Sequence, residues 1–511
     1  MPQWLKNAIF YEIYPQSFCD SNQDGIGDIR GIISKLDYIQ SMGFNALWLN
    51  PCFVSPFMDA GYDVQDYYKV APRYGTNQDL VDLFNQCHQR GIHVLLDLVP
   101  GHTSDQNEWF LRSKSPVRNE YSDRYVWTNC VWDRPSGYSW VAGNADRDGC
   151  YMLNFFNSQP ALNFGFNQIT NPDWQMSYTD ERVKGAFDDI LNVMRFWLDL
   201  GADGFRVDMA DSLVKNDEEK VATASLWRRA RAMLDESYPN AALVSEWCNG
   251  RRSINMAGFH CDFILNHGGK LSELAFRHYE EGVNKSYFCK TAHVSAEGML
   301  KLYLDDYYAT RENGYLAIIS GNHDTERISH YLSEQELRLA YAFILTMPGT
   351  PFMYYGDEIG MRYLPQPSKE GGFHRTGSRT PMQWNSSLAN MGFSTAQKYQ
   401  LYLDVDGSAD APNVHDQLQD PSSLLNWVKA LNALRLQRED LQADTLLEII
   451  VCRNDGLLVY KRGNTYVAIN PTDGPLSSPI GVGNVLLQTG SFTADGNGTT
   501  LGAQTAIIFT L

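Results

Sequence analysis

The chain has 511 residues, of which 43% are hydrophobic and 13% aromatic, so it can bury a large core in two or three domains and is not intrinsically disordered. Its 60 acidic residues outnumber the 42 basic ones, and the formal charge of -18 argues against nucleic acid as the main ligand. No signal peptide precedes the first predicted strand, and no run reaches the roughly 18 apolar residues of a membrane span. The sequence therefore predicts a soluble protein that binds neither nucleic acid nor a membrane.

The cysteine pattern indicates a cellular compartment. The chain contains nine cysteines, an odd number, and none of them form the C-x-x-C spacing of zinc or redox sites. Reduced thiols are the expected state of such a set in the cytoplasm. We therefore expect a cytoplasmic protein.

Short buried strands alternate with amphipathic helices along most of the chain. In one such unit Thr76 and Asp79 predict a capping box, an apolar helix face follows from Leu80 to Cys87, and Gly91 ends the helix. Eight strands are predicted, at residues 9–14, 46–50, 93–97, 203–208, 242–246, 262–265, 316–320 and 351–355. Because no G-x-G-x-x-G loop follows a strand, this α/β pattern favours a parallel (β/α)8 TIM barrel over an open doubly wound sheet.

Three stretches depart from the barrel pattern. Residues 101–171 are too long and polar for a simple loop, and they predict a small inserted domain after the third strand. A long loop is expected at about 356–421, inside the second part of the barrel at 172–445. From 446 to 511 short alternating runs separated by Gly, Asn and Asp predict a C-terminal all-β domain, a β-sandwich. The first part of the barrel comprises residues 1–100.

Acidic residues follow several predicted strands. Asp97, Asp208 and Glu246 close three of them, and Asp324 lies just beyond the seventh. One such carboxylate alone is usually a helix cap or part of an ion pair. Several that converge from separate strands raise one another's pKa, which is costly unless they have a function.

Paired carboxylates suit the hydrolysis of glycosidic bonds. A retaining enzyme needs one carboxyl group to attack the anomeric carbon and a second, about 5 Å away, to protonate the leaving oxygen. Asp208 and Glu246 are candidates for these roles. Arg206 faces the same side of its strand as Asp208 and is expected to keep it ionised. His102 and His323 are candidates to hydrogen-bond sugar hydroxyls, although a single histidine is more often a core residue.

Four short motifs resemble the α-amylase superfamily of glycoside hydrolases, family 13, and the resemblance extends over essentially the whole chain. They are DLVPGH at 97–102, GFRVDMA at 204–210, SEW at 245–247 and GNHDTER at 321–327. The resemblance implies a TIM barrel in which Asp208 is the nucleophile, Glu246 the general acid/base and Asp324 a stabiliser of the distorted transition state. It also implies that Arg206, His102 and His323 assist them.

Two further segments resemble the oligo-1,6-glucosidase, α-glucosidase and trehalose synthase group of that family. In SPFMDAGYDVQDY, Tyr62 would stack under the nonreducing sugar and Asp59 would bind its hydroxyls. In RTPMQW at 379–384, Arg379 would close the pocket for the terminal sugar together with Asp59. The resemblance implies exo-acting attack on short oligosaccharides.

Three positions depart from the family pattern. Gly101 stands where an Asn usually precedes the histidine and helps many amylases to bind calcium between the barrel and the inserted domain. Ala161 occupies a position that is often Asp in exo-glucosidases, and Met209 matches neither of the residues associated with α-1,6 or α-1,4 preference. The linkage preference therefore stays open.

A metal-binding pattern lies near the start of the chain. Oxygen ligands repeat at alternate positions around a glycine turn, as in a calcium loop. The candidate ligands are Asp20, Asn22, Asp24, Ile26 and Asp28. A turn without metal is the alternative, but related glucosidases bind a cation in a similar loop, so we expect structural Ca2+.

Three functions remain open. The first is a retaining hydrolase that cleaves α-glucosidic bonds of short oligosaccharides. The second is a transglycosidase, such as a trehalose synthase or sucrose isomerase, which uses the same carboxylates but excludes water. The third is an inactive homologue with a binding role, which the presence of all three catalytic carboxylates argues against. The oligomeric state is not predicted.

Overall fold

The computed structural model describes residues 1–265, 270–495 and 498–511. Its centre is a sheet of eight parallel strands in the order β13-β10-β9-β8-β5-β2-β1-β14. A parallel bridge between Ile319 and Phe352 joins the two ends of this order. The strands are β1 (Phe10–Ile13), β2 (Ala46–Leu49), β5 (His93–Leu98), β8 (Gly204–Val207), β9 (Ala242–Ser245), β10 (Cys261–Ile264), β13 (Tyr315–Ile318) and β14 (Phe352–Tyr354). The predicted TIM barrel is confirmed, and the ends of its strands differ from the prediction by one or two residues.

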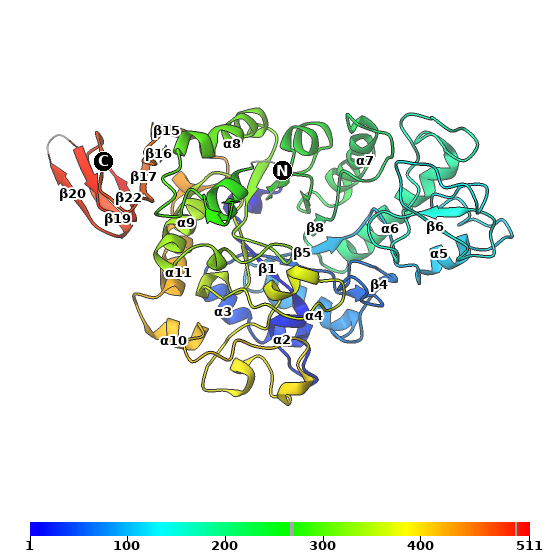
Figure 1. The fold of residues 1–511 in the computed structure, drawn as a ribbon, viewed down its shortest axis with the longest axis horizontal. Coiled ribbons are helices and arrows are strands. Elements are labelled where there is room, and N and C mark those ends of the chain that lie inside the picture. Colours follow the sequence, from blue (N-terminus) through cyan, green and yellow to red (C-terminus); the bar gives the residue numbers. More distant parts are fainter. Residues whose placement is uncertain (266–269, 496–497) are drawn as a thin grey trace.

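Helices follow the strands and cover the outside of the barrel (Figure 1). They are α2 (Ile29–Ile33), α3 (Leu36–Ser41), α4 (Asn77–His88), α6 (Glu181–Asp199), α7 (Val221–Ser237), α8 (Ala296–Thr310), α9 (Glu334–Thr346) and α11 (Leu424–Gln437). The predicted capping box of Thr76 and Asp79 begins α4. After β9 the chain instead forms a short π-helix, Arg251–Met256.

The barrel interior is filled by a separate apolar cluster, which supports the carboxyl ends of the strands. Phe10 and Phe352 stack with centroids 4.0 Å apart, and Trp48 packs against Phe263. The indole of Trp48 donates to Asp97 at 3.0 Å, so the apolar interior directly positions the first of the strand-end carboxylates. Gly204 begins β8 with a φ of 138°, and a Cβ there would lie 2.0 Å from the Ala242 carbonyl oxygen. Both features require glycine at this position.

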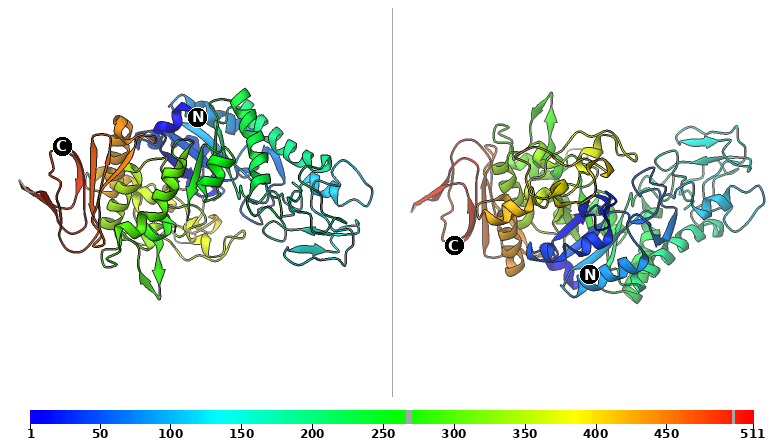
Figure 2. Two further views of the ribbon diagram at one scale, coloured as in Figure 1. Left: turned by 90° about the horizontal axis from the view of Figure 1, so that it is seen from above. Right: turned by 90° about the horizontal axis from the view of Figure 1, so that it is seen from below.

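The segment between β5 and α6 projects from one end of the elongated molecule (Figures 1 and 2). It contains α5 (Glu108–Ser113), β6 (Trp140–Ala142) and β7 (Cys150–Met152). It also has a small core of its own, in which Trp174 contacts Trp140 and Phe166 edge to face. The described chain thus has an insertion after the third barrel strand, and the boundaries 101 and 171 stay predictions.

The C-terminal part lies at the opposite end of the molecule (Figure 2). It consists of a five-stranded antiparallel sheet, β15-β16-β17-β22-β19, and a three-stranded one, β18-β21-β20. The strands are β15 (Leu447–Cys452), β16 (Leu458–Arg462), β17 (Thr465–Asn470), β18 (Leu476–Ser478), β19 (Asn484–Thr489), β20 (Phe492–Asp495), β21 (Gly498–Leu501) and β22 (Thr505–Thr510). The predicted C-terminal all-β domain is confirmed.

Smaller elements lie in the connections. They are the 3-10 helix η1 (Gln3–Asn7), α1 (Pro15–Phe18), the ribbon β3 (Phe53–Val54) and β4 (Asp66–Val70), the ribbon β11 (Tyr279–Glu280) and β12 (Val283–Asn284), and α10 (Val414–Gln419). The predicted long loop at 356–421 holds several 3-10 turns, including η6 (Phe373–Ser378). In the described part of the chain no helix is both long and apolar enough to cross a bilayer.

Candidate active site

A cavity of about 330 Å³ lies at the carboxyl ends of the barrel strands. Catalytic groups of TIM barrels gather at this end, because the loops that follow the strands meet there. Six of the predicted site residues line it: Asp59, Tyr62, His102, Asp208, Glu246 and Asp324. Six others line it as well: Phe155, Met209, Leu265, Asn322, Thr325 and Arg375.

Arg206 connects three carboxylates beneath this cavity. Its Nη1 contacts Asp97 Oδ1 at 2.9 Å and Asp208 Oδ1 at 3.0 Å, and its Nη2 lies 2.8 Å from Glu246 Oε2. The guanidinium is fully buried and stacks over Trp48, 4.8 Å from the ring. Arg206 thus holds the carboxyl ends of β5, β8 and β9 together.

The backbone after the candidate nucleophile is bent toward Glu246. Met209 has a φ of 41°, in the left-handed region that non-glycine residues rarely adopt, and its N–H donates to Glu246 Oε2 at 3.0 Å. This bond fixes the Glu246 carboxyl, and Arg206 contacts both this carboxyl and that of Asp208. The two carboxyl groups are therefore held as a pair.

Burial controls the protonation of this pair. Loss of hydration raises the pKa of Glu246 to about 7, with Asp208 adding to the effect and Arg206 opposing it. Burial likewise raises the pKa of Asp208 to about 7, although Arg206 lowers it. Arg206 was expected to keep Asp208 ionised, but its charge only partly offsets the lost hydration. The pair can therefore hold one proton near neutral pH, as a nucleophile and an acid together require.

Asp324 has the opposite environment. Burial disfavours its charge, but His323, Arg375 and Arg379 more than compensate and hold its pKa far below the usual range. Arg375 Nη1 and Arg379 Nη2 donate to Asp324 Oδ1 at 2.8 and 2.9 Å. Asp324 is therefore a fixed negative charge opposite the pair.

Tyr62 forms part of the cavity wall, and His323 stacks behind it. Their rings are nearly parallel, with centroids 5.0 Å apart, and the Tyr62 hydroxyl donates to Asp97 at 2.9 Å. His323 Nδ1 lies 3.0 Å from Glu12 Oε1, and its Nε2 lies 3.5 Å from Asp324 Oδ2. The two aromatic rings are fixed by buried polar contacts.

Asp59 contacts the inserted segment through Gln159 and the long loop through Arg375. The Gln159 amide donates to its Oδ2 at 2.8 Å, and Arg375 Nη2 approaches its Oδ1 at 3.5 Å. Burial raises the pKa of Asp59 to about 7. The guanidinium that reaches Asp59 on the cavity wall is that of Arg375, whereas Arg379 lies behind Asp324 and donates to the His323 carbonyl.

His102 has both ring nitrogens engaged within the protein. Nε2 lies 3.1 Å from the Tyr62 carbonyl, and Nδ1 lies 3.1 Å from the Asn154 amide. Burial lowers the pKa of His102 to about 4, so the ring is neutral at neutral pH. His102 therefore shapes the cavity wall, and a sugar hydroxyl would have to replace one of these contacts.

A lysine bridges Asn154 and Ser212, the two residues whose atoms lie nearest to Gly101. A Cβ on Gly101 would lie 2.7 Å from Asn154 Nδ2, so an Asn side chain does not fit there without rearrangement. Lys215 Nζ donates instead to Asn154 Oδ1 at 2.9 Å and to the Ser212 carbonyl at 2.6 Å. The ammonium group thus joins the inserted segment to the barrel in the region where amylases with the usual Asn hold calcium.

The candidate calcium loop folds around its own polar groups. Asp20 Oδ1 accepts from the N–H groups of Asn22 and Gln23, Asn22 Oδ1 accepts from Asp24, and Asp24 Oδ1 accepts from Ile26. Asp28 caps α2. Among the described residues no three His, Cys, Asp or Glu side chains gather as a metal site. The donor set is all oxygen, which suits Ca2+, but ligation requires Asn22 and the Ile26 carbonyl beside the carboxylates.

Sequence reasoning missed Arg375, Phe155 and Gln159. Arg375 lies four residues before the RTPMQW motif, in a polar loop whose path no local pattern reveals. Phe155 lies on the cavity wall and is 49% exposed. The only sequence signal for it is that it is an apolar residue in a polar segment. Gln159 lies in the polar inserted segment, where no local pattern distinguishes it from its neighbours.

Comparisons with known proteins show which family the chain resembles. Residues 12–444 match the family model described as alpha amylase, catalytic domain. The chain is 33% identical over 492 residues to a trehalose synthase/amylase of Mycolicibacterium smegmatis, covering 87% of this chain and 78% of that protein. It is 29% identical over 580 aligned residues to an oligo-1,6-glucosidase of Heyndrickxia coagulans, covering 100% of both.

A solved structure shows the same fold. An isomaltulose synthase variant from Erwinia rhapontici, in complex with D-glucose, superposes with a TM-score of 0.82 at 24% identity and covers 100% of this chain and 99% of that one. The chain belongs to the α-amylase family, glycoside hydrolase family 13, and is an enzyme that acts on α-glucosidic bonds.

Proposed function

We propose that the protein is a retaining α-glucosidase that hydrolyses short oligosaccharides from the nonreducing end. The observation that supports this most directly is the buried pair of Asp208 and Glu246, with Asp324 across the same cavity. Two close carboxyl groups of which one is protonated are what a double displacement needs.

In the first step Asp208 attacks the anomeric carbon and forms a glycosyl ester, while Glu246 transfers its proton to the departing glycosidic oxygen. In the second step the Glu246 carboxylate takes a proton from water, and the resulting hydroxide oxygen displaces Asp208 from the anomeric carbon. Water is consumed, one sugar leaves in each step, and both carboxyl groups return to their starting states. Asp324 stays ionised throughout and would stabilise the positive charge that develops on the sugar ring.

The remaining site residues would bind the terminal sugar. Tyr62 offers an aromatic face, and Asp59 and Arg375 would bind hydroxyl groups with charge-assisted hydrogen bonds, while Arg379 would hold Asp324 from behind. Asp59 and Arg375 close one side of the cavity, which favours a chain end over the middle of a polymer. His102, His323 and Arg206 would hold these groups in place.

Transglycosylation is the second candidate. The observation in its favour is the 33% identity to a trehalose synthase/amylase. The same glycosyl ester would then be attacked by a hydroxyl of the retained sugar, and the product would be an isomer of the substrate.

We further propose that Ca2+ binds the loop of Asp20, Asn22, Asp24, Ile26 and Asp28 in a structural role and that the enzyme acts in the cytoplasm. The all-oxygen loop supports the first proposal. The nine unpaired cysteines are compatible with the second.

Product analysis tests the proposed activity. Purified protein is incubated with maltose, isomaltose, sucrose, trehalose and a maltooligosaccharide, and the products are separated by chromatography. Proton NMR early in the reaction identifies which anomer of glucose is released first. Free glucose that appears first as the α-anomer supports a retaining glucosidase. An isomeric disaccharide with little free glucose would indicate transglycosylation instead of hydrolysis.

Two matched variants tie the activity to the pair. Glu246→Gln and Asp208→Asn should each lower turnover by about 10² to 10⁴ or more while the fold is kept. Unchanged turnover in Glu246→Gln would contradict the mechanism.

A further inference from the structure

Three large apolar side chains are exposed near the cavity that holds the carboxyl pair. Met58 is 59% exposed, Phe155 49% and Phe373 57%. Phe155 lines the cavity and is also accessible to solvent, so it lies at the opening. Met58 directly precedes Asp59, and Phe373 lies two residues before Arg375, so both belong to segments that reach the same cavity. Apolar surface gathered beside a polar site indicates that the surface contacts a ligand.

The phenyl rings of Phe155, Phe156 and Phe373 form a continuous row. Phe155 and Phe156 have ring centroids 4.3 Å apart, and the Phe156 centroid lies 5.9 Å from that of Phe373 with the ring planes tilted by 59°. The first two belong to the inserted segment after β5, and Phe373 belongs to η6 in the long loop. We call these three residues the aromatic row. It starts at the cavity wall and extends outward over two segments that are distant in the sequence.

The backbone holds this row in place. Phe373 has a φ of 47°, in the left-handed region that bulky residues rarely adopt, and its N–H donates to the Ser368 hydroxyl at 2.9 Å. The Phe156 N–H donates to the Gln159 side-chain oxygen at 2.7 Å, and the nitrogen of that amide donates to Asp59 at 2.8 Å. Backbone strain that presents an exposed ring is not repaid by burial of that ring, and such strain is typical of functional sites.

The size of the active-site cavity determines where the rest of a substrate lies. Its volume of about 330 Å³ is near the lower end of the range for small-molecule sites, which suits one sugar ring. When the anomeric carbon of that ring faces Asp208, the group beyond the glycosidic oxygen must extend through the opening. The aromatic row borders this opening, because Phe155 is both its first ring and part of the cavity wall.

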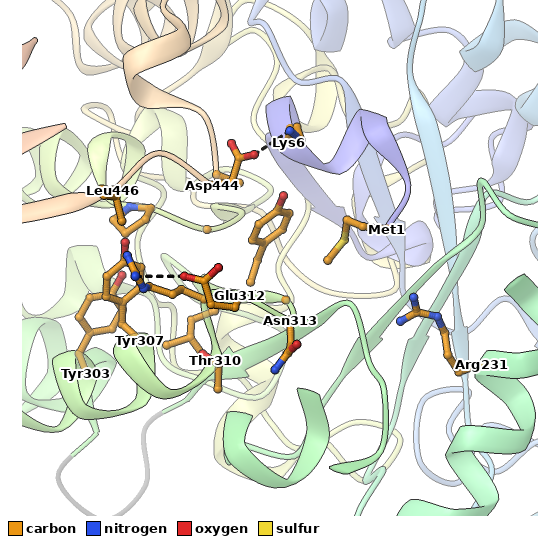
Figure 3. A pocket seen from close by; sticks show the side chains of 17 residues that line it. Met1, Lys6, Arg231, Tyr303, Tyr307, Thr310, Glu312, Asn313, Asp444 and Leu446 are labelled. Atoms are coloured by element: carbon orange, nitrogen blue, oxygen red, sulfur yellow. Dashed lines mark ion pairs between the residues drawn. The ribbon is translucent and has the colours of Figure 1, made fainter. Parts of the chain in front are cut away.

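A second and larger cavity, of about 550 Å³, lies at the opposite end of the barrel and has a different lining (Figure 3). Its tyrosines Tyr303, Tyr307 and Tyr315 are only 2%, 6% and 6% exposed. On its wall Lys6 pairs with Asp444 at 2.7 Å. Buried rings and paired charges leave little surface for a ligand there, whereas the rings at the active-site opening are accessible.

We propose that the aromatic row binds the leaving group of the substrate and that the enzyme therefore favours α-glucosides whose leaving group is an aromatic alcohol. This proposal rests on the proposed glucosidase function. Aromatic rings attract one another in stacked and edge-to-face arrangements, and contact with a ligand ring would remove the exposed faces of Phe155 and Phe373 from water.

Two pairs of small glucosides test this proposal. Hydrolysis of benzyl α-glucoside is compared with that of methyl α-glucoside, because benzyl alcohol and methanol are similar in acidity and differ mainly in the ring. Titration calorimetry compares the corresponding 1-thio-α-glucosides, which resist hydrolysis, so binding is measured without turnover. In wild type we expect a higher kcat/KM and a lower Kd for the benzyl compound of each pair, by about fivefold or more.

Variants of Phe373 localise the effect. Phe373→Ala should reduce the benzyl preference by about fivefold in both kcat/KM and Kd. Phe373→Tyr keeps the ring and should keep the preference, and Phe373→Leu, which keeps apolar bulk, is a second variant should the alanine variant fail to fold. Tyr399→Ala is the matched control, since Tyr399 is an 86% exposed aromatic residue of the same long loop, and it should leave the preference unchanged.

Three results would overturn the proposal: equal Kd values of the two thioglucosides in wild type, no binding of either, or the same benzyl preference in wild type, Phe373→Ala and Phe373→Leu. Failure of the proposed glucosidase function gives a different result. In that case wild type hydrolyses neither glucoside, and the Kd values of the thioglucosides still decide whether the aromatic row binds a ring.

Discussion

Arg206 holds the candidate active site together at the level of single residues. It contacts Asp97, Asp208 and Glu246 with one fully buried guanidinium group. The sequence predicted that Arg206 lies beside Asp208, because the two residues share a face of one strand. It could not reveal that loss of hydration outweighs this attraction, because burial depends on every element packed around the strand.

The raised pKa of Asp208 predicts that the site costs stability at neutral and alkaline pH. An Asp carboxyl has a pKa near ~4 in an unfolded chain, and about 7 in the folded protein. The folded state therefore binds this proton more tightly, and the associated stability is fully present below about pH 4 and is lost as the pH rises toward about 7.

Asp208→Asn removes this cost. We expect its free energy of unfolding, relative to wild type, to be about 2 kcal/mol more favourable at about pH 8 than at about pH 5. Denaturant titrations at both pH values measure it. Equal pH dependence of wild type and Asp208→Asn would contradict the prediction.

At the level of elements, the insertion after β5 completes the cavity that the barrel strands begin. Gln159 reaches Asp59, Phe155 lies on the cavity wall, and Asn154 holds His102. Lys215, in the loop after β8, links this insertion to the barrel. Substrate binding therefore depends on a contact between two loops that are distant in the sequence.

Lys215→Met tests this link. It leaves the half-buried Asn154 oxygen without a donor and frees the amide that holds His102, so we expect a loss of about 1 kcal/mol of stability. The KM should rise severalfold while kcat changes less. Lys220→Met is the control, because Lys220 lies at the edge of the same loop, its side chain is 23% exposed, and it pairs with Asp211 and not with Asn154. Steady-state kinetics with an unchanged KM in Lys215→Met would refute the role of this lysine.

At the level of the whole molecule, the barrel lies between the insertion and the C-terminal sheets, and long loops connect distant parts of the chain. The candidate calcium loop is one such connection. Asp20 Oδ2 accepts from the Ser394 hydroxyl, and the Tyr402 N–H donates to the Gly25 carbonyl. An ion in this loop would therefore stabilise the long loop that supplies Arg375 to the active site.

Calcium removal tests this coupling. At a free calcium concentration about 100 times the Kd, binding to the folded state alone adds about 2.7 kcal/mol of stability. The melting temperature should accordingly fall on addition of EDTA and recover with calcium. Asp24→Asn should abolish the recovery, and Asp404→Asn, at an exposed position of the long loop, should keep it. A wild-type melting temperature that changes with neither EDTA nor calcium would exclude the calcium site.

The sequence by itself determined the eight barrel strands, the C-terminal β domain, and the positions of Asp208, Glu246 and Asp324, because strand periodicity and short motifs are local properties. Only the tertiary structure decided the contact of Arg375 with Asp59, the bridge of Lys215 between Asn154 and Ser212, and the protonation of the carboxyl pair. Each of these depends on which distant segments meet and how much water they exclude, and both follow from the packing of the whole chain.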